Sequence, residues 1–259
     1  MEVQWANLKA SELRDLAARE AIVVLPVAAM EQHGPHLPVM VDTLLCGEVA
    51  ARAAKRASGQ HPVVVAPTVW SGLSEHHMPF GGTFTLDFPT FCSLIECLCR
   101  SLERHGFRRV LLLNGHGGNV AALRVVVDEL RPLDMRLLTA TYWQVDPVAI
   151  ADLLERQSGV QHACEAETSM VMALRPELVD ASKFAAAKHV EPGRVAGQAQ
   201  AVHSAMRFEE RTPTGAIGDP TAASAEKGEK LLEAAATAVA GVLSNDELWA
   251  LPRSGSGRA

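Results

Sequence analysis

The fold is decided by residues 21–38, which read AIVVLPVAAMEQHGPHLP. The segment 21–29 is a continuous apolar run, and such a run bounded by polar residues is typical of a strand that is buried on both faces. Runs of the same kind occur at 62–66, 109–113 and 135–140. The sequence therefore predicts four strands of a mainly parallel sheet.

Segments with a helical spacing of apolar residues alternate with these strands, at 11–20, 42–57, 89–104, 119–130, 147–156, 167–174 and 219–243. The alternation indicates an α/β fold in which helices cover both faces of the sheet. The last helix is expected to begin at Asp219, an N-cap residue that Pro220 follows. Because no stretch has the composition of a linker, we expect one domain over residues 1–253 and a flexible tail over 254–259.

Charge and composition exclude several classes of protein. The chain has 259 residues, with 24 Lys and Arg against 30 Asp and Glu, and this acidic balance argues against a nucleic-acid partner. No apolar run approaches the roughly 20 residues that a membrane span needs, and the first residues lack the pattern of a signal peptide. The five cysteines suit neither a disulfide framework nor a C-x-x-C zinc site. We therefore expect a cytoplasmic protein with no membrane partner.

Polar clusters follow the predicted strands where they end. EQHGPH occupies 31–36 after the first strand, NGHGGN occupies 114–119 after the third, and HACEAETS occupies 162–169 beyond the fourth. In an open parallel sheet the ligand crevice lies at the carboxyl ends of the strands, so we expect these clusters to share one site.

The residue types in these clusters suit a metal ion. Glu31 and His33 are two residues apart and would project the same way from an extended segment, while Asp42 and His116 add a carboxylate and an imidazole. Mixed oxygen and nitrogen donors suit Zn²⁺ or Mn²⁺. Each residue alone is also explained by helix capping or by a Gly-Pro turn, but the convergence of four ligand types favours a metal centre.

The glycine-rich loop at 114–119 has a second interpretation, since such a loop between a strand and a helix can bind phosphate. The loop lacks the G-x-G-x-x-G spacing and a Walker lysine. His116 at its centre fits a metal better than a pyrophosphate, so nucleotide binding is the weaker hypothesis.

These motifs resemble the creatininase (creatinine amidohydrolase) family of metal-dependent amidohydrolases. The resemblance covers most of the chain and is carried by EQHGPHLP at 31–38, NGHGGN at 114–119, ETS at 167–169 and GDP at 218–220. It implies a three-layer α/β/α fold, a dinuclear metal centre and a homo-oligomer, usually a hexamer. The metals would be zinc or manganese, with iron as a further option.

The resemblance also implies a ligand set. Glu31, Asp42 and His116 would hold one ion, and His33 and Asp42 the other, so that Asp42 bridges both. Creatininase proper completes the second site with a glutamate where this chain has Gly118. We expect Glu167 to replace it, with Glu165 as the alternative, because a third carboxylate makes a buried centre of two ions and a hydroxide neutral.

His162 aligns with the catalytic histidine of the family and is the expected general acid/base, with Glu167 as the second catalytic residue. The substrate-binding residues are expected to be His36, His77, Trp143, Gly117 and Gly118. Gly117 stands where creatininase proper has an aromatic residue, and Ser158 and Gln161 replace two further wall residues.

The wall that encloses creatinine is therefore largely absent from the sequence. The expected activity is hydrolysis of a non-peptide C–N bond in a small amide, cyclic amide or formamide. The pattern is closer to relatives that hydrolyse formamides or that trim a modified peptide in mycofactocin maturation. A mycofactocin-type peptidase, or a ligand-binding scaffold of the same fold without catalysis, is the alternative.

Overall fold

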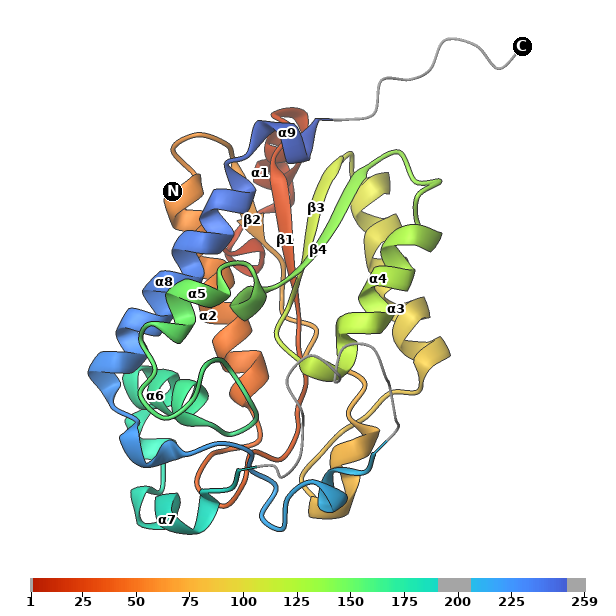
Figure 1. The fold of residues 1–259 in the computed structure, drawn as a ribbon. Coiled ribbons are helices and arrows are strands. Elements are labelled where there is room, and N and C mark those ends of the chain that lie inside the picture. The colour runs from red at the N-terminus through yellow and green to blue at the C-terminus, as the bar shows by residue number, and fades with distance from the viewer. Residues whose placement is uncertain (1, 191–205, 251–259) are drawn as a thin grey trace.

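The computed structural model describes residues 2–190 and 206–250, so the tail predicted at 254–259 lies outside the described residues. Its sheet consists of β1 (Ile22–Val27), β2 (Val63–Val65), β3 (Arg109–Asn114) and β4 (Arg136–Thr141). All the pairings are parallel and the order is β2-β1-β3-β4, which confirms the predicted sheet (Figure 1).

Two helical layers cover the sheet, and β1 shows why its sequence is continuously apolar. Ile22 and Val24 pack in one cluster with α2 (Val41–Ala57), α6 (Glu165–Leu174) and α8 (Ala225–Leu243). Val23 and Leu25 pack in the other cluster, which includes residues of α1 (Ala10–Ala18), α3 (Phe88–Arg104) and α4 (Val120–Glu129). Successive side chains of a strand point to opposite faces, so both faces of β1 are buried. The α/β prediction is confirmed.

The described residues also form three short α-helices, α5 (Pro147–Ala151), α7 (Phe184–Ala187) and α9 (Asp246–Trp249), and several 3₁₀ turns. None of the described helices combines the length and apolar composition that a membrane crossing requires.

Most predicted helix boundaries are within two residues of the observed ones, but two are clearly wrong. The helix predicted over 147–156 ends at Ala151 because the amides of Glu155 and Arg156 donate to the carboxylate of Glu165 instead of to helix carbonyls. The helix predicted from Asp219 begins at Ala225. Asp219 caps only the 3₁₀ turn Pro220–Ala222, and Ser224 caps α8 by accepting the amide of Lys227.

The register of the strands positions the site. Val27 at the end of β1 pairs with Asn114 of β3, and Asn114 pairs with Thr141 of β4. The three strands therefore end at one level, and the chain segments that follow them begin from the same edge of the sheet.

Candidate metal centre

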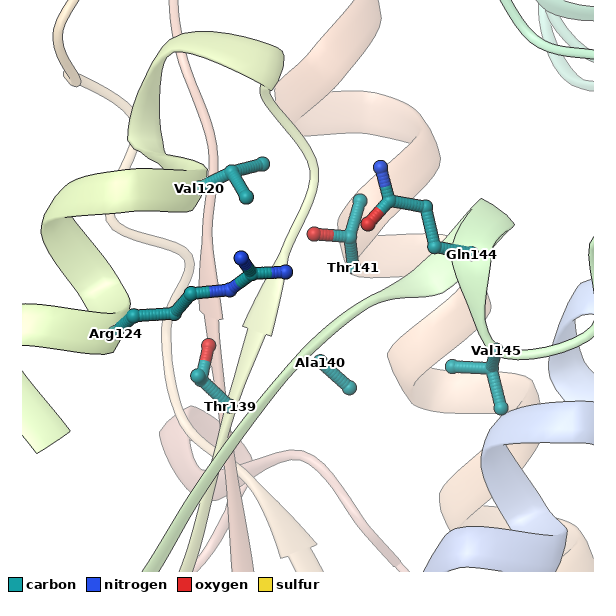
Figure 2. Close-up of a pocket in the computed structure, with 7 residues that line it drawn as sticks. All are labelled: Val120, Arg124, Thr139, Ala140, Thr141, Gln144 and Val145. Carbon is teal, nitrogen blue, oxygen red and sulfur yellow. The ribbon is translucent and has the colours of Figure 1, made fainter. Parts of the chain in front are cut away.

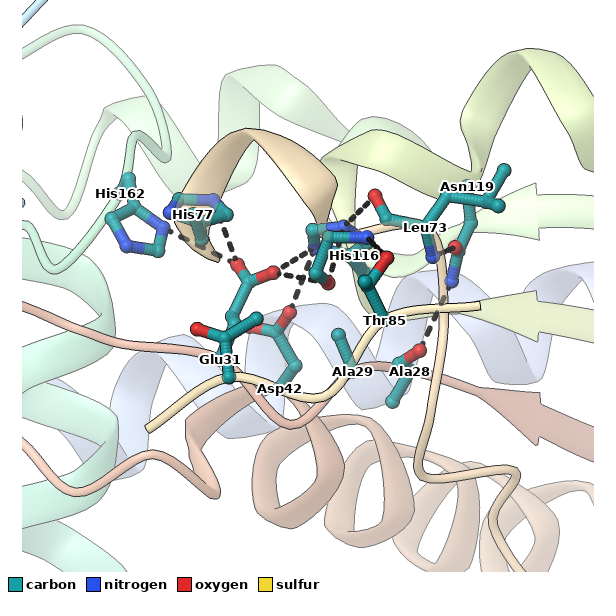
Figure 3. A network of polar contacts seen from close by, with 12 residues as sticks. Ala28, Ala29, Glu31, Asp42, Leu73, His77, Thr85, His116, Asn119 and His162 are labelled. Atoms are coloured by element: carbon teal, nitrogen blue, oxygen red, sulfur yellow. Dashed lines mark hydrogen bonds and ion pairs between the residues drawn. The ribbon is translucent and has the colours of Figure 1, made fainter. Parts of the chain in front are cut away.

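Five buried side chains from four segments meet beyond this edge, and Figure 3 shows three of them, Glu31, Asp42 and His116. Glu31 and His33 follow β1, Asp42 lies in the first turn of α2, His116 follows β3, and Glu167 lies in the first turn of α6. The most exposed of the five, Glu167, is only 6% exposed. The structure thus brings together all five residues that the sequence predicted as metal ligands.

The first ligand group is Glu31, Asp42 and His116, whose ligand atoms lie within 4.8 Å of one another. His116 Nδ1 is 3.1 Å from Glu31 Oε2 and 3.0 Å from Asp42 Oδ2. Ligand atoms at these separations can bind one metal ion together.

The second ligand group is His33, Asp42 and Glu167. His33 Nε2 is 3.2 Å from Asp42 Oδ1 and 3.9 Å from Glu167 Oε2. Asp42 therefore presents one carboxylate oxygen to each group, which is the arrangement that a bridging ligand needs.

Backbone carbonyls orient both histidines. His33 Nδ1 donates to the carbonyl of Glu31 at 3.0 Å, and His116 Nε2 lies 3.1 Å from the carbonyl of Leu73. Because a carbonyl only accepts, these ring nitrogens carry the proton in a neutral ring, and the opposite nitrogen faces the carboxylates as a lone pair. Metal-binding histidines are commonly oriented in this way.

Two buried atoms test whether the site fits a metal. His33 Nε2 and Asp42 Oδ2 make no hydrogen bond within the described part of the chain, although charged partners lie near them. Buried polar atoms without a hydrogen bond are uncommon and costly in proteins. Both atoms belong to the ligand groups, so the residues fit divalent ions.

Charge in the centre shifts the pKa values of its residues. Burial lowers the pKa of His33, but the nearby carboxylates of Asp42, Glu167 and Glu31 together outweigh burial and raise this pKa to about 9. His116 shifts in the same direction, because the charges of Glu31 and Asp42 outweigh burial and hold its pKa well above the usual range. The pKa of Asp42 is lowered, since the charges and hydrogen bonds of His33 and His116 together outweigh the opposing effect of burial. The carboxylates therefore attract positive charge into this buried position, as a divalent-ion site must.

Comparison with known proteins identifies the family of this chain. A family model described as creatinine amidohydrolase matches residues 6–243. The chain belongs to the creatininase family. Creatinine amidohydrolase from Pseudomonas putida is 31% identical, over 92% of this chain and 93% of its own length. A mycofactocin precursor peptide peptidase from Mycolicibacterium smegmatis is 30% identical, over 96% of this chain and 94% of its own.

Solved structures agree with this assignment. A crystal structure of creatininase superposes with a TM-score of 0.79 at 30% identity, covering 94% of this chain and 97% of the other. Two related creatininase structures, each 29% identical, are a manganese form and a zinc–zinc form of a mutant. The chain is therefore a creatininase-family hydrolase.

His162 and His77 lie beside the carboxylate of Glu31 (Figure 3). His162 Nδ1 is 3.6 Å from Glu31 Oε1, and His77 Nε2 is 3.3 Å from the same oxygen. Burial, followed by the charge of His33, holds the pKa of His162 well below its ordinary value, so its ring is neutral in the metal-free protein. Glu31, His33 and His162 also form a third set whose ligand atoms lie within 4.8 Å of one another.

Glu165 has a different environment from Glu167, although both lie in the first turn of α6. Its carboxylate accepts the amides of Glu155 and Arg156 and a hydrogen bond from Lys227 Nζ. Glu165 belongs to none of the ligand groups found among the described residues. These contacts give Glu165 a structural role.

The residues predicted to bind substrate divide into two sets. His77 and Gly117 lie at the site, and a Cβ on Gly117 would meet no atom within 4 Å. His36 is 2% exposed and bonds to Thr168 Oγ1, while Trp143 packs against the cluster that includes α2 and α8. The assignment of these four residues and of Gly118 to substrate binding stays a prediction.

Gly118 has no space for a side chain. A Cβ there would lie 2.3 Å from the carbonyl oxygen of Leu73 and 2.5 Å from His116 Nε2. In this loop conformation no glutamate fits at the position where creatininase proper carries one, so a second-site carboxylate has to come from elsewhere.

Two residues of the site were not assigned a role from the sequence. Ser74 donates to Glu31 Oε2 at 2.7 Å, and Gln32 Nε2 lies 2.8 Å from His77 Nδ1 and 3.1 Å from His162 Nε2. Gln32 could have been noticed because it separates Glu31 from His33 in the motif. Ser74 had no comparable signal, since it reaches the site through a loop that follows β2.

A separate hollow of about 220 Å³ lies at the outer edge of β4 (Figure 2). It is lined by Val120, Arg124, Thr139, Ala140, Thr141, Gln144 and Val145. No acid or histidine is among these residues, so the hollow is distinct from the metal centre.

Proposed function

We propose that this hydrolase uses two divalent metal ions to cleave a non-peptide C–N bond in a small amide, cyclic amide or formamide. The observation that carries the proposal is Asp42, whose two oxygens face separate ligand groups. Glu31 and His116 complete the first group, and His33 and Glu167 the second. Zinc or manganese suits these oxygen and nitrogen donors, and both occur in related creatininases.

The bound ions would supply a nucleophile near neutral pH by lowering the pKa of water, and would polarise the amide carbonyl. The side chains of the protein position the ions and the group that transfers the proton. Glu31, Asp42 and Glu167 bring three negative charges, and burial, opposed by His33, raises the pKa of Glu167 to about 7 in the metal-free protein. His162 lies 3.6 Å from Glu31 and is the group that we expect to exchange a proton with the leaving nitrogen.

The substrate that we propose is larger than creatinine. Gly117 leaves open space where creatininase proper has an aromatic side chain, and Ser158 and Gln161 are both exposed. A small planar ring would be loosely held, and loss of positioning costs rate. The expected homo-oligomer, a hexamer by family resemblance, and the cytoplasmic location belong to the same proposal.

Metal analysis tests the dinuclear centre. After dialysis, the wild-type protein should retain close to two ions per chain. Asp42→Ala should lose both ions because Asp42 faces both groups, whereas His33→Ala should lose chiefly one. Unchanged metal content in Asp42→Ala would refute the bridging role, and metal retention without any turnover would favour the scaffold alternative.

A substrate panel tests the activity. We expect the metal-loaded protein to hydrolyse a formamide or a cyclic amide with a kcat/KM at least roughly hundredfold above that for creatinine. Short peptides belong in the panel, since a mycofactocin-type peptidase would prefer them. Creatinine turnover of about 10 per second or more would contradict the proposal.

A further inference from the structure

The side chain of Gln32 makes polar contacts with three other segments of the site and with its own turn, and it is only 6% exposed. Its Nε2 lies 2.8 Å from His77 Nδ1, 3.0 Å from the carbonyl oxygen of Gly215 and 3.1 Å from His162 Nε2. Its Oε1 accepts the amide of Gly34 at 2.9 Å. The rings of His77 and His162 are 4.4 Å apart and stacked.

The number of available protons determines the donor and the acceptor in each of these contacts. His162 Nε2 is 2.7 Å from the backbone carbonyl of Gln32, which only accepts, so this ring nitrogen carries a proton. It then cannot accept from the Gln32 side chain. The two amide protons of Gln32 therefore go to the carbonyl of Gly215 and to His77 Nδ1.

The same assignment of protons determines which ring nitrogen of His77 and of His162 faces the metal centre and whether it is protonated. A neutral His77 that accepts at Nδ1 carries its proton on Nε2, which faces Glu31 Oε1 at 3.3 Å. A neutral His162 with its proton on Nε2 presents the lone pair of Nδ1, 3.6 Å from Glu31 Oε1. His162 Nδ1 and Glu31 Oε1 are then both hydrogen-bond acceptors, and a proton or another positive charge between them would be stabilised.

Two glycine turns, at Gly34 and Gly215, surround the side-chain amide of Gln32. Gly215 has a φ of +79°, and a Cβ there would lie 2.1 Å from Gln32 Oε1. Gly34 has a φ of +65°, which turns its amide toward the same oxygen. Both glycines adopt a conformation that other residues rarely take, and both turns meet the Gln32 side chain.

We propose that Gln32 is a positioning residue, whose backbone carbonyl and side-chain amide hold His162 with Nδ1 free toward the metal centre and His77 with Nδ1 as an acceptor. The catalytic use of that lone pair rests on the proposed function. The orientation and proton position of the two rings do not depend on any substrate.

The first test is nitrogen NMR of ¹⁵N-histidine-labelled protein, both metal-free and zinc-loaded. For His162 we expect a protonated Nε2 and an unprotonated Nδ1, and for His77 the same assignment. A proton on Nδ1 of His162 with Nε2 unprotonated would overturn the proposal. This result is independent of turnover, so it remains distinguishable from failure of the proposed function.

The second test is Gln32→Glu, which keeps the shape but cannot donate to His77 or Gly215. We expect kcat to fall roughly tenfold to hundredfold with KM changed less than about threefold and zinc content unchanged. The His77 signal should shift in the same variant. Gln144→Glu, at the exposed hollow beside β4, is the matched control and should leave kcat and the histidine signals unchanged.

An unchanged kcat and unchanged histidine signals in Gln32→Glu would refute the positioning role. If that variant does not fold, the proton positions measured in the wild-type protein decide the question alone.

Discussion

At the scale of single residues, the two buried carboxylates in the first turn of α6 have different roles. Glu167 faces His33 in the ligand group and accepts the amide of Ala163 at 2.6 Å. Glu165 is fully buried and binds the side chain of Lys227. Residues two apart on a helix are separated by about 200°, so only one of them can face the metal centre.

Glu167→Gln should therefore lower occupancy of the second ion and abolish turnover, while unfolding stays cooperative. The physical reason is that the amide keeps the shape but loses the charge that offsets the ion. Elemental analysis and urea unfolding measure both effects.

Glu165→Gln is the matched comparison. It should keep both ions but lower the free energy of unfolding by about 3 kcal/mol, because it leaves the ammonium of Lys227 short of a buried partner. Loss of metal from Glu165→Gln but not from Glu167→Gln would reverse the two assignments.

At the scale of elements, the packing of α6 on α8 holds Glu167 in place. Gly228 of α8 contacts the backbone of α6 so closely that a Cβ there would lie 1.8 Å from the carbonyl oxygen of Ser169. A clash with a backbone carbonyl cannot be relieved by the rotation of a side chain. The approach of these two helices thus depends on the absence of a side chain at this position.

Gly228→Ala should separate the helices and lower the free energy of unfolding by about 3 kcal/mol, with weaker binding of the second ion because α6 carries Glu167. Gly241→Ala on the same helix is the control, since a Cβ there meets no atom within 4 Å. The control should raise stability by about 0.5–1 kcal/mol through helix propensity. Equal stabilities for the two variants in urea unfolding would contradict this account.

At the scale of the whole molecule, the metal centre links stability to pH. In the metal-free protein the carboxylates of Asp42, Glu167 and Glu31 together outweigh burial and raise the pKa of His33 to about 9, from about 6.5 in the unfolded chain. The folded state therefore holds this proton more tightly. The resulting stability is complete below the unfolded pKa and is lost as pH rises through the folded pKa.

We expect the metal-free protein to lose roughly 2 kcal/mol of stability between pH 7 and 8.5. Zinc-loaded protein should show a flatter dependence, because the ions take the place of the protons on the ligands. Urea unfolding with a chelator or with zinc measures both slopes, and His33→Gln should flatten the metal-free curve. Equal slopes with and without metal would count against this linkage.

The sequence by itself determined the architecture and the chemistry of the donors. Continuous apolar runs such as 21–29 specify strands buried on both faces, because no polar face is left for solvent. Glu31, His33 and His116 follow strand ends, and parallel strands end at one edge of the sheet. The four strands and the convergence of Glu31, His33 and His116 were therefore predictable from local pattern, whereas Glu167 was expected from the family resemblance.

Only the tertiary structure decided which atoms face each other. The end of α5 at Ala151 and the separate role of Glu165 both come from hydrogen bonds between segments that local periodicity does not describe. The same holds for Ser74 and Gln32, which reach the site through loops. Local sequence encodes the turn-by-turn preference of the backbone, whereas the direction of a buried carboxylate or amide is fixed by partners that arrive from distant parts of the chain.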